Sequence, residues 1–367
     1  MFRAWGGLLF ASMAMLASSG AGQDGVGFQT GSAGPSLSRA GEIGLSVMTY
    51  NIKGLPWPVA LGRDDPLARI ADRLVEMRRQ GRQAHIILLQ EAFSSQAVAL
   101  ARQAGYRHVT LGPDAEMPSA PATTATDSRY VQQARWDRGE GVGKVLSSGL
   151  MILSDYPVDH VDRMAFPDFA CAGFDCLANK GVLIVHVEVP GVGRVSIVDT
   201  HLNARTAAGV PVPRSQQAYE RQVELMARFV AQRVPRGSMV VLGGDMNIGG
   251  DPLRRRAFFA AFERSGLSFV TPALGGAQQA DGLADAGERQ DLRYLTRRGK
   301  DWIFARSATG SPLEVLGAHV PFGTEPGGEP LSDHFGYVIR YAAAAPARHE
   351  GIHFASREQS AALAEPR

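Results

Sequence analysis

The sequence predicts an α/β protein in which mixed β-sheets are buried under helices. Short apolar runs typical of buried strands alternate irregularly with stretches that carry apolar residues at helical spacing, and hairpin turns join some of the runs. The sequence has no regular strand–helix–strand repeat and no internal repeat. With 367 residues, 45% hydrophobic and 20% charged, it is ordinary for an enzyme that buries a sizeable core. Because no linker divides it, we expect one domain at residues 45–341.

The clearest predicted strand is 240–245, where Val-Val-Leu runs into two glycines and then Asp245 and Asn247. This pattern predicts a buried strand followed by a turn that presents polar side chains at a fixed place. An Asx-turn after a core strand explains the stretch equally well on its own. Further strand-like stretches lie at 45–52, 86–89, 147–154, 182–189, 195–200, 301–304 and 331–339.

Helices are predicted where apolar residues recur every three or four positions. The first is expected to begin at Pro66, with Asp65 as its cap, and to end at Gly81. Three more helices are expected at 95–103, 215–233 and 254–265, and two long loops at 113–143 and 273–290.

Both ends of the chain are predicted to lie outside the folded domain. Arg3, an apolar or small-residue run up to Ala17, and a small-x-small sequence at 19–21 are typical of a cleaved signal peptide. The apolar run is too short for a convincing membrane span. We therefore expect a secreted or periplasmic protein, with a signal peptide at 1–21, a flexible leader at 22–44 and a frayed tail at 342–367.

The two cysteines of the chain, Cys171 and Cys176, lie close together. In an exported protein such a pair is expected to form a disulfide, and export disfavours the alternative of two free thiols. A loop this small removes little chain entropy, so the bond would hold a local loop shape.

Polar residues stand at the ends of the predicted strands, where burial does not require them. Each alone has an ordinary explanation, such as a turn-forming asparagine, a glutamate at a helix start or a partly buried histidine. Packing alone does not explain the whole set: Asn51, Glu91, His201, Asp245, Asn247, Asp301, Asp333 and His334. Because Mg²⁺ prefers oxygen ligands, Glu91 is the best candidate ligand, with Asn51 beside it.

Six segments occur in a fixed order along the chain: Met48–Ile52, Leu89–Glu91, Ser148–Ile152, Thr200–Leu202, Gly244–Asn247 and Ser332–His334. In this order they resemble the endonuclease/exonuclease/phosphatase superfamily, which includes type I deoxyribonuclease, apurinic endonucleases, inositol polyphosphate 5-phosphatases and neutral sphingomyelinases. The resemblance covers residues 45–341. It implies a four-layered α/β sandwich of two packed mixed sheets flanked by helices. It also implies cleavage of phosphate esters that depends on Mg²⁺, with Mn²⁺ or Co²⁺ as substitutes.

Two segments resemble the secreted bacterial neutral sphingomyelinases within that superfamily. Residues 171–182 combine a cysteine-bounded loop with the sequence Asn-Lys-Gly, and residues 50–56 are similar to the first motif of that family. The family often has an aromatic residue at the position of Lys53 and a glutamine at that of Asn203. The resemblance implies hydrolysis of sphingomyelin to ceramide and phosphocholine.

The resemblance also implies roles in catalysis. His334 would be the general base that activates water, oriented by Asp301 in a carboxylate–imidazole pair. Asp245 is the competing candidate for activating or orienting the water. His201 would donate a hydrogen bond or proton near the phosphate or the leaving group.

Further residues would hold the substrate and the metal. Asn247 and Asn203 would bind phosphate oxygens. Lys180 would contact the phosphate, although a solvated surface lysine is an equal alternative. Asp333 would reach the metal or position His334.

Other classes of function fit the sequence less well. His201 and His334 lack the neighbouring histidines or cysteines of a zinc site, and the Gly-x-Ser-x-Gly elbow of many serine hydrolases is absent from the sequence. A net charge of +2 gives no support to a protein that coats nucleic acid. We expect a monomer that acts on phospholipid at a membrane surface, with no specific nucleic-acid partner. The alternatives are a nuclease or phosphoinositide phosphatase of the same superfamily, and a catalytically silent binding protein.

Overall fold

The computed structural model describes residues 44–55, 61–269, 282, 284–285, 287–311, 313–327 and 329–342. The predicted signal peptide, the leader up to residue 43 and the tail after Ala342 lie outside these residues. Gly44 begins the first strand and Ala342 ends the last, so each belongs to a strand rather than to the leader or the tail. Among the described residues, no helix is long and apolar enough to cross a membrane.

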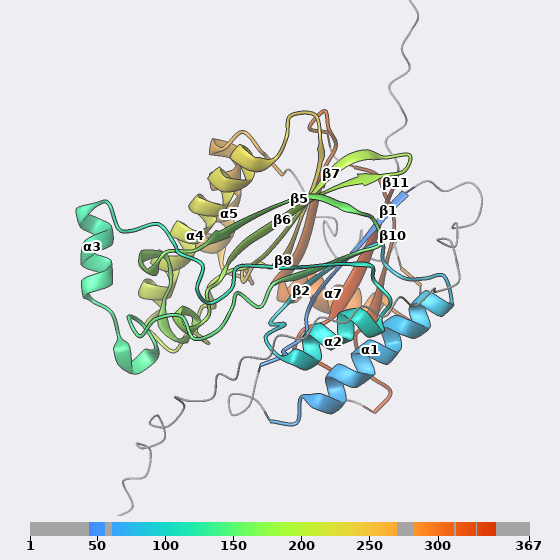
Figure 1. Ribbon diagram of the computed structural model, residues 1–367, viewed down its shortest axis with the longest axis horizontal. Helices are drawn as coiled ribbons and strands as arrows, with labels where there is room; N and C mark the ends of the chain where they lie inside the picture. The colour runs from blue at the N-terminus through green and yellow to red at the C-terminus, as the bar shows by residue number, and fades with distance from the viewer. Residues whose placement is uncertain are drawn as a thin grey trace, which may run out of the picture. The chain divides into compact units, whose positions relative to one another are not determined.

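Two mixed β-sheets form the centre of the fold (Figure 1), which confirms the predicted fold class. The first sheet has six strands in the order β10-β11-β1-β2-β4-β3. Only β1 and β2 pair in parallel, and the other neighbours are antiparallel. The strands are β1 (Gly44–Asn51), β2 (Ile86–Gln90), β3 (His108–Leu111), β4 (Met151–Ser154), β10 (Val315–Phe322) and β11 (Gly336–Ala342).

The second sheet has five strands in sequence order, β5-β6-β7-β8-β9. Here β7 and β8 are parallel, and the other pairs are antiparallel. Each sheet therefore contains one parallel pair, whose two strands end at the same edge. The strands are β5 (Val158–Ala165), β6 (Gly181–Val189), β7 (Gly193–His201), β8 (Met239–Asp245) and β9 (Asp301–Arg306).

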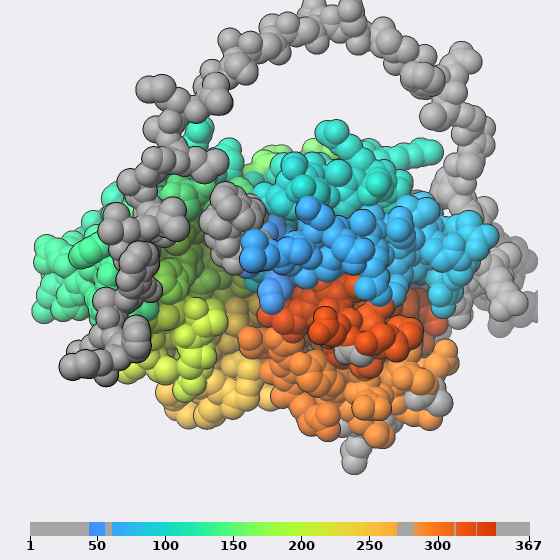
Figure 2. All heavy atoms as spheres, turned by 90° about the horizontal axis from the view of Figure 1, so that it is seen from below, coloured from blue at the N-terminus to red at the C-terminus, as the bar shows by residue number. Residues whose placement is uncertain are grey.

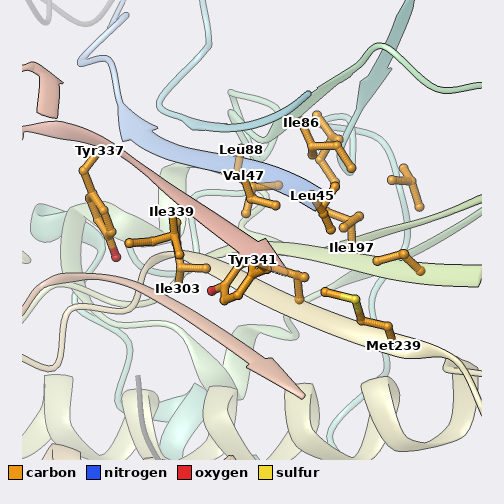
Figure 3. Packing of buried hydrophobic residues seen from close by; sticks show 14 of the residues in the cluster. Leu45, Val47, Ile86, Leu88, Ile197, Met239, Ile303, Tyr337, Ile339 and Tyr341 are labelled. Carbon is orange, nitrogen blue, oxygen red and sulfur yellow. The ribbon is translucent and has the colours of Figure 1, made fainter. Parts of the chain in front are cut away.

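The two sheets pack face to face and bury a shared core (Figure 3). Val47 and Leu88 of the first sheet meet Ile197 of the second in one buried cluster. Because side chains alternate along a strand, Met48 faces the opposite way and packs with the helices α1 and α2, while Ile184 does the same with α4 and α5. The result is four layers: helices, sheet, sheet, helices. These helices are α1 (Asp64–Arg79), α2 (Ser95–Gln103), α4 (Val212–Arg233) and α5 (Pro252–Arg264).

The first helix differs from its prediction at its start. It begins at Asp64 rather than Pro66, and Arg63 occupies the cap position without a side-chain cap. Asp65 lies in the first turn, where the helix dipole favours a carboxylate. On the face shown in Figure 2, the blue N-terminal residues lie against the red C-terminal ones. Part of this contact is an ion pair between Arg73 of α1 and Glu325, with Nη2 and Oε2 2.8 Å apart.

The sequence prediction missed three strands, β3, β5 and β10, and each is an edge strand of its sheet. An edge strand has one neighbour and buries less, so its apolar pattern is weak: β5 reads Val-Asp-His-Val-Asp-Arg-Met-Ala. The predicted loop 113–143 contains α3 (Ala125–Gln132), capped by Thr124, and the end of the predicted loop 273–290 begins α7 (Arg289–Arg298). β4 starts four residues later than the predicted strand at 147, after Gly149 adopts a φ of 68°.

Candidate active site

The predicted polar residues come together because the strands that carry them end side by side. In the second sheet, His201 of β7 is the register partner of Asp245 of β8, which in turn pairs with Asp301 of β9. In the first sheet, Asn51 of β1 pairs with the last residue of β2, and Glu91 follows immediately. The two parallel pairs therefore bring the ends of both sheets to one place.

Asn51 joins the two sheets at the site. Its Nδ2 donates to Glu91 Oε1 at 2.9 Å and lies 3.3 Å from Asp245 Oδ2. Asn51 is fully buried, and Glu91 adopts a φ of 56°, a conformation rare outside glycine. Burial raises the pKa of Glu91, while the Asn51 hydrogen bond and the charge of Lys180 oppose the rise. A partly buried carboxylate is thus held by a strained turn, as is common at functional sites.

His334 lies between two buried carboxylates. Its Nδ1 is 2.8 Å and 2.9 Å from the two oxygens of Asp301, and its Nε2 is 3.6 Å from Asp245 Oδ2. Burial alone would lower the pKa of His334, but Asp301 and Asp245 outweigh it and raise the pKa to about 9. In this state His334 carries a proton at neutral pH.

His201 flanks the same carboxylate from the other side and is neutral. Its Nε2 is 3.5 Å from Asp245 Oδ2, and its buried Nδ1 has no hydrogen-bond partner among the described residues. Burial, reinforced by the charges of Lys180, His334 and Lys300, holds the pKa of His201 well below its usual value. Two histidines with separated pKa values beside one carboxylate can divide the work of accepting and donating protons.

The raised pKa of His334 predicts that stability depends on pH in the metal-free protein. Its folded-state pKa lies above the unfolded value of 6.5, so the proton stabilises the fold fully below pH 6.5. That stabilisation is lost as the pH rises through about 9, and it amounts to about 3 kcal/mol. Urea unfolding in EDTA at pH 6 and pH 9.5 measures the loss. His334→Gln should flatten it, and an equal pH dependence in the variant would contradict the assignment.

Asn247 lies within the cluster, whereas Asn203 does not. The backbone N–H of Asn247 donates to Asp245 Oδ1 at 3.0 Å, and its side-chain Nδ2 donates to the carbonyl of Leu202 at 2.9 Å. Both side-chain ends of Asn203 are used within the protein, since Oδ1 accepts from the N–H of Ala172 and Nδ2 donates to a backbone carbonyl. Asn203 therefore holds the cysteine loop, and we leave it out of the proposed phosphate site.

Lys180 is buried rather than a solvated surface residue. Only 5% of it is exposed, and its Nζ lies 2.7 Å from Asp175 Oδ1. Asp175 belongs to the loop that the predicted disulfide between Cys171 and Cys176 closes. The predicted disulfide is present, and the loop that it closes supplies the carboxylate partner of Lys180.

Asp333 is the exposed member of the predicted set. Its side chain is 57% exposed, and its Oδ2 lies 3.6 Å from Lys53 Nζ. The prediction that Asp333 ligates the metal gains no support from this position.

The oxygen donors at the ends of β1, β2 and β8 fit a divalent metal ion. The oxygen-bearing side chains of Glu91, Asn51 and Asp245 converge, and burial raises the pKa of both carboxylates, so a bound cation would supply the missing positive charge. A second group consists of Asp245, Asp301 and His334, with one ligand atom from each lying within 4.8 Å of the others. Because Asp301 already holds His334 Nδ1, this second group is better explained as an ion pair.

The sequence analysis did not identify several residues that shape the site. Arg254 is fully buried, and its Nη1 donates to the carbonyls of Asn203 and Asn247 at 2.8 Å each, which ties the two site loops together. Below the site, Gln90 Nε2 donates to Asp199 Oδ1 at 2.7 Å across the two sheets. For Arg254 and Asp199 the sequence pattern indicated a buried position. Arg254 precedes a buried phenylalanine by one helical turn, and Asp199 falls on the alternation that points into the sheet interface.

This fold and site define a protein of the two-sheet α/β sandwich class to which type I deoxyribonuclease belongs. Residues 48–334 match the model of the endonuclease/exonuclease/phosphatase family, and the chain belongs to that family.

Several known proteins that are similar to this chain are named sphingomyelinase or beta toxin. Sphingomyelinases of Mycobacterium tuberculosis and Mycobacterium bovis are 25% identical over 314 residues, 81% of this chain and 52% of theirs, so the chain spans about half their length. The fold is similar to that of beta toxin from Staphylococcus aureus, with a TM-score of 0.55, 17% identity and coverage of 81% and 99%. A mutant of that toxin contains bound magnesium ions. Sphingomyelinase C from Streptomyces griseocarneus gives a TM-score of 0.53, 20% identity and coverage of 82% and 99%.

Proposed function

We propose that this protein is a phosphoric diester hydrolase that depends on a divalent metal and cleaves sphingomyelin to ceramide and phosphocholine. The observation that carries the proposal is Asn51, which joins Glu91 of one sheet to Asp245 of the other, with a histidine on each side of Asp245. The choice of sphingomyelin is supported by the sequence likeness to the mycobacterial sphingomyelinases.

Glu91, Asn51 and Asp245 would hold the metal, which we propose to be Mg²⁺, with Mn²⁺ or Co²⁺ as substitutes. When bound, the ion supplies positive charge for a phosphate oxygen and for the departing oxygen. This choice fits the oxygen donors of the site, and the magnesium ions of the beta toxin mutant are in line with it.

The side chains of the site provide the proton chemistry. Asp301 fixes the ring of His334 through Nδ1, so that Nε2 faces Asp245 and the place of reaction. We propose that His334, once neutral, takes a proton from the attacking water, with Asp245 orienting that water. His201 donates a hydrogen bond to the phosphate or the leaving oxygen, and Asn247 and Lys180 lie close enough to the cluster to contribute to phosphate binding.

Export is a further part of the proposal. The disulfide between Cys171 and Cys176 favours an oxidising compartment, and the N-terminal sequence is typical of a signal peptide. We propose that the protein is secreted or periplasmic and acts as a monomer on phospholipid at a membrane surface.

A substrate panel tests the proposal directly. Sphingomyelin, phosphatidylcholine, plasmid DNA and a phosphoinositide are each incubated with the protein in Mg²⁺ and in EDTA. We expect release of phosphocholine from sphingomyelin in Mg²⁺ and none in EDTA. DNA nicking or release of inorganic phosphate would instead support a nuclease or phosphatase on the same site. No turnover of any substrate would favour the catalytically silent binding protein.

A further inference from the structure

Lysine is rare in this chain, and its few lysines are unevenly placed. The 38 basic residues include only four lysines, Lys53, Lys144, Lys180 and Lys300. The first three have carboxylate partners at 3.6 Å, 3.1 Å and 2.7 Å. Lys300 has no ion pair with any residue that the structure describes. Lys300 is therefore the one lysine whose charge no described carboxylate pairs.

Lys300 lines a groove beside the catalytic cluster. The groove has a volume of about 460 Å³ and is walled by the loop after β7, the loop between β8 and α5, and the residue before β9. Asn247 and Lys300 both line it. The carboxylate in its wall, Asp251, is already engaged, since its oxygens accept from Arg205 Nε at 2.7 Å and from the N–H of Leu253 at 2.9 Å. Asp251 therefore does not neutralise the positive charge that Lys300 brings to the groove.

The backbone fixes Lys300 next to the reaction site. Its carbonyl accepts from the N–H of Met246 at 2.9 Å, and the carbonyl of Gly299 accepts from the N–H of Gly249 at 2.7 Å. Lys300 directly precedes Asp301, the partner of His334. Its charge helps to lower the pKa of His201 and opposes the burial that raises the pKa of Asp245. Its ammonium therefore acts electrostatically on both sides of the cluster.

The charged groups of the site indicate a role for the positive charge of Lys300, which is to offset the negative charge of a bound phosphodiester. The carboxylates of Glu91, Asp245 and Asp301 gather around the site together with the imidazole of His334, and a divalent cation would offset part of their negative charge. A phosphodiester then brings one further negative charge, and more negative charge develops on its oxygens as water attacks. Of the four lysines, Lys300 is the one whose ammonium has no carboxylate partner among the described residues, which leaves it available for this charge.

We propose that Lys300 is a further catalytic residue, whose ammonium binds a non-bridging phosphate oxygen in the groove and stabilises the charge that develops there. The groove accordingly receives the anionic part of the substrate. This inference rests on the proposed hydrolysis of a phosphodiester, but it does not depend on sphingomyelin being the substrate. Removing a single preorganised donor of this kind costs about 10²- to 10³-fold in turnover.

The test compares Lys300→Gln and Lys300→Arg with Arg228→Gln, which removes a positive charge from the exposed part of α4. Turnover is measured on sphingomyelin and on bis(4-nitrophenyl) phosphate, and binding of inorganic phosphate to the Mg²⁺-loaded protein is measured by calorimetry. We expect Lys300→Gln to lose at least about 10²-fold in kcat/KM and to bind phosphate at least about tenfold more weakly. Lys300→Arg should recover part of both losses, and Arg228→Gln should match the wild type.

The outcomes separate this inference from the proposed function. If the wild type hydrolyses only the small diester, sphingomyelin is the wrong substrate, and Lys300 is still tested on the diester. If the wild type hydrolyses neither substrate, the calorimetric measurement of phosphate binding decides whether Lys300 contacts phosphate. Phosphate binding and turnover of Lys300→Gln within about twofold of the wild type would overturn the role of Lys300. So would a wild type that neither turns over a diester nor binds phosphate. A thermal unfolding midpoint shared by all variants shows that the effects are not losses of fold.

Discussion

Replacing His334 with glutamine is expected to reduce turnover by about 10⁴-fold, at the upper end of what one positioned acid or base contributes. His334 faces Asp245 through Nε2 and is fixed by Asp301 through Nδ1, so the change removes both the proton carrier and its orientation. Asp301→Asn should lose less, because it keeps the imidazole but weakens its alignment. Initial rates on the substrate identified by the panel measure both effects.

A second buried histidine provides the matched control. His186 lies on β6 with its Nε2 3.2 Å from Asp162 Oδ2 and its Nδ1 3.0 Å from Ser196 Oγ, so it also forms a buried histidine–carboxylate pair. It takes no part in the cluster around Asp245. His186→Gln should lower stability without changing kcat beyond about twofold. Comparable losses of turnover in both histidine variants would show that His334 acts through the fold rather than through chemistry.

The pH profile decides whether His334 accepts or donates the proton. Because its pKa is raised to about 9, a base role predicts that kcat/KM increases with pH up to about that value. An acid role predicts that kcat/KM falls above it. Binding of a divalent cation beside Asp245 moves the inflection to lower pH and leaves its direction unchanged. A profile that is flat between pH 5 and pH 10 would contradict both roles.

The sequence predicted the residues of the cluster better than their protonation. Polar residues at the ends of buried runs, such as Asn51 and Asp245, are visible because burial does not require them. The proton on His334 depends on two carboxylates from different strands, Asp301 and Asp245, and their distances exist only once β8 and β9 pair. Local sequence therefore identifies candidate groups, while tertiary pairing sets their charge states.

The same distinction explains the parts of the fold that the sequence did not reveal. Central strands such as β2 are buried on both faces and read as continuous apolar runs. The edge strands β3, β5 and β10 bury less and carry no such signal. Asn203 was expected to bind phosphate, as the resemblance implies, but its Oδ1 accepts from the N–H of Ala172 in the cysteine loop and its Nδ2 donates to the carbonyl of Ala204. A motif position shows where a residue lies in the chain, and hydrogen-bond partners decide what remains free for substrate.

Glu91→Gln is expected to abolish metal-dependent turnover and to stabilise the metal-free protein. The change removes the charge that would hold the cation, and loss of charge stabilisation by the metal, worth several kcal/mol, corresponds to at least about 10³-fold in rate. Burial raises the pKa of Glu91, so at neutral pH its negative charge is less favourable in the folded chain than in the unfolded one. Calorimetric Mg²⁺ titration and urea unfolding in EDTA measure the two effects.

Glu325 is the matched glutamate, because its pKa moves in the opposite direction. Hydrogen bonds from Arg73, together with the charges of Arg73 and Arg69, lower the pKa of this buried carboxylate, so its charge stabilises the fold above its unfolded pKa and that stabilisation is lost in acid. Glu325→Gln should therefore destabilise the protein at neutral pH and leave Mg²⁺ binding unchanged. We expect the two variants to change stability in opposite directions, and only Glu91→Gln to lose metal binding. This result would show that Glu91 serves to bind the metal, whereas Glu325 serves to stabilise the fold. If Glu91→Gln binds Mg²⁺ as the wild type does, the metal lies elsewhere.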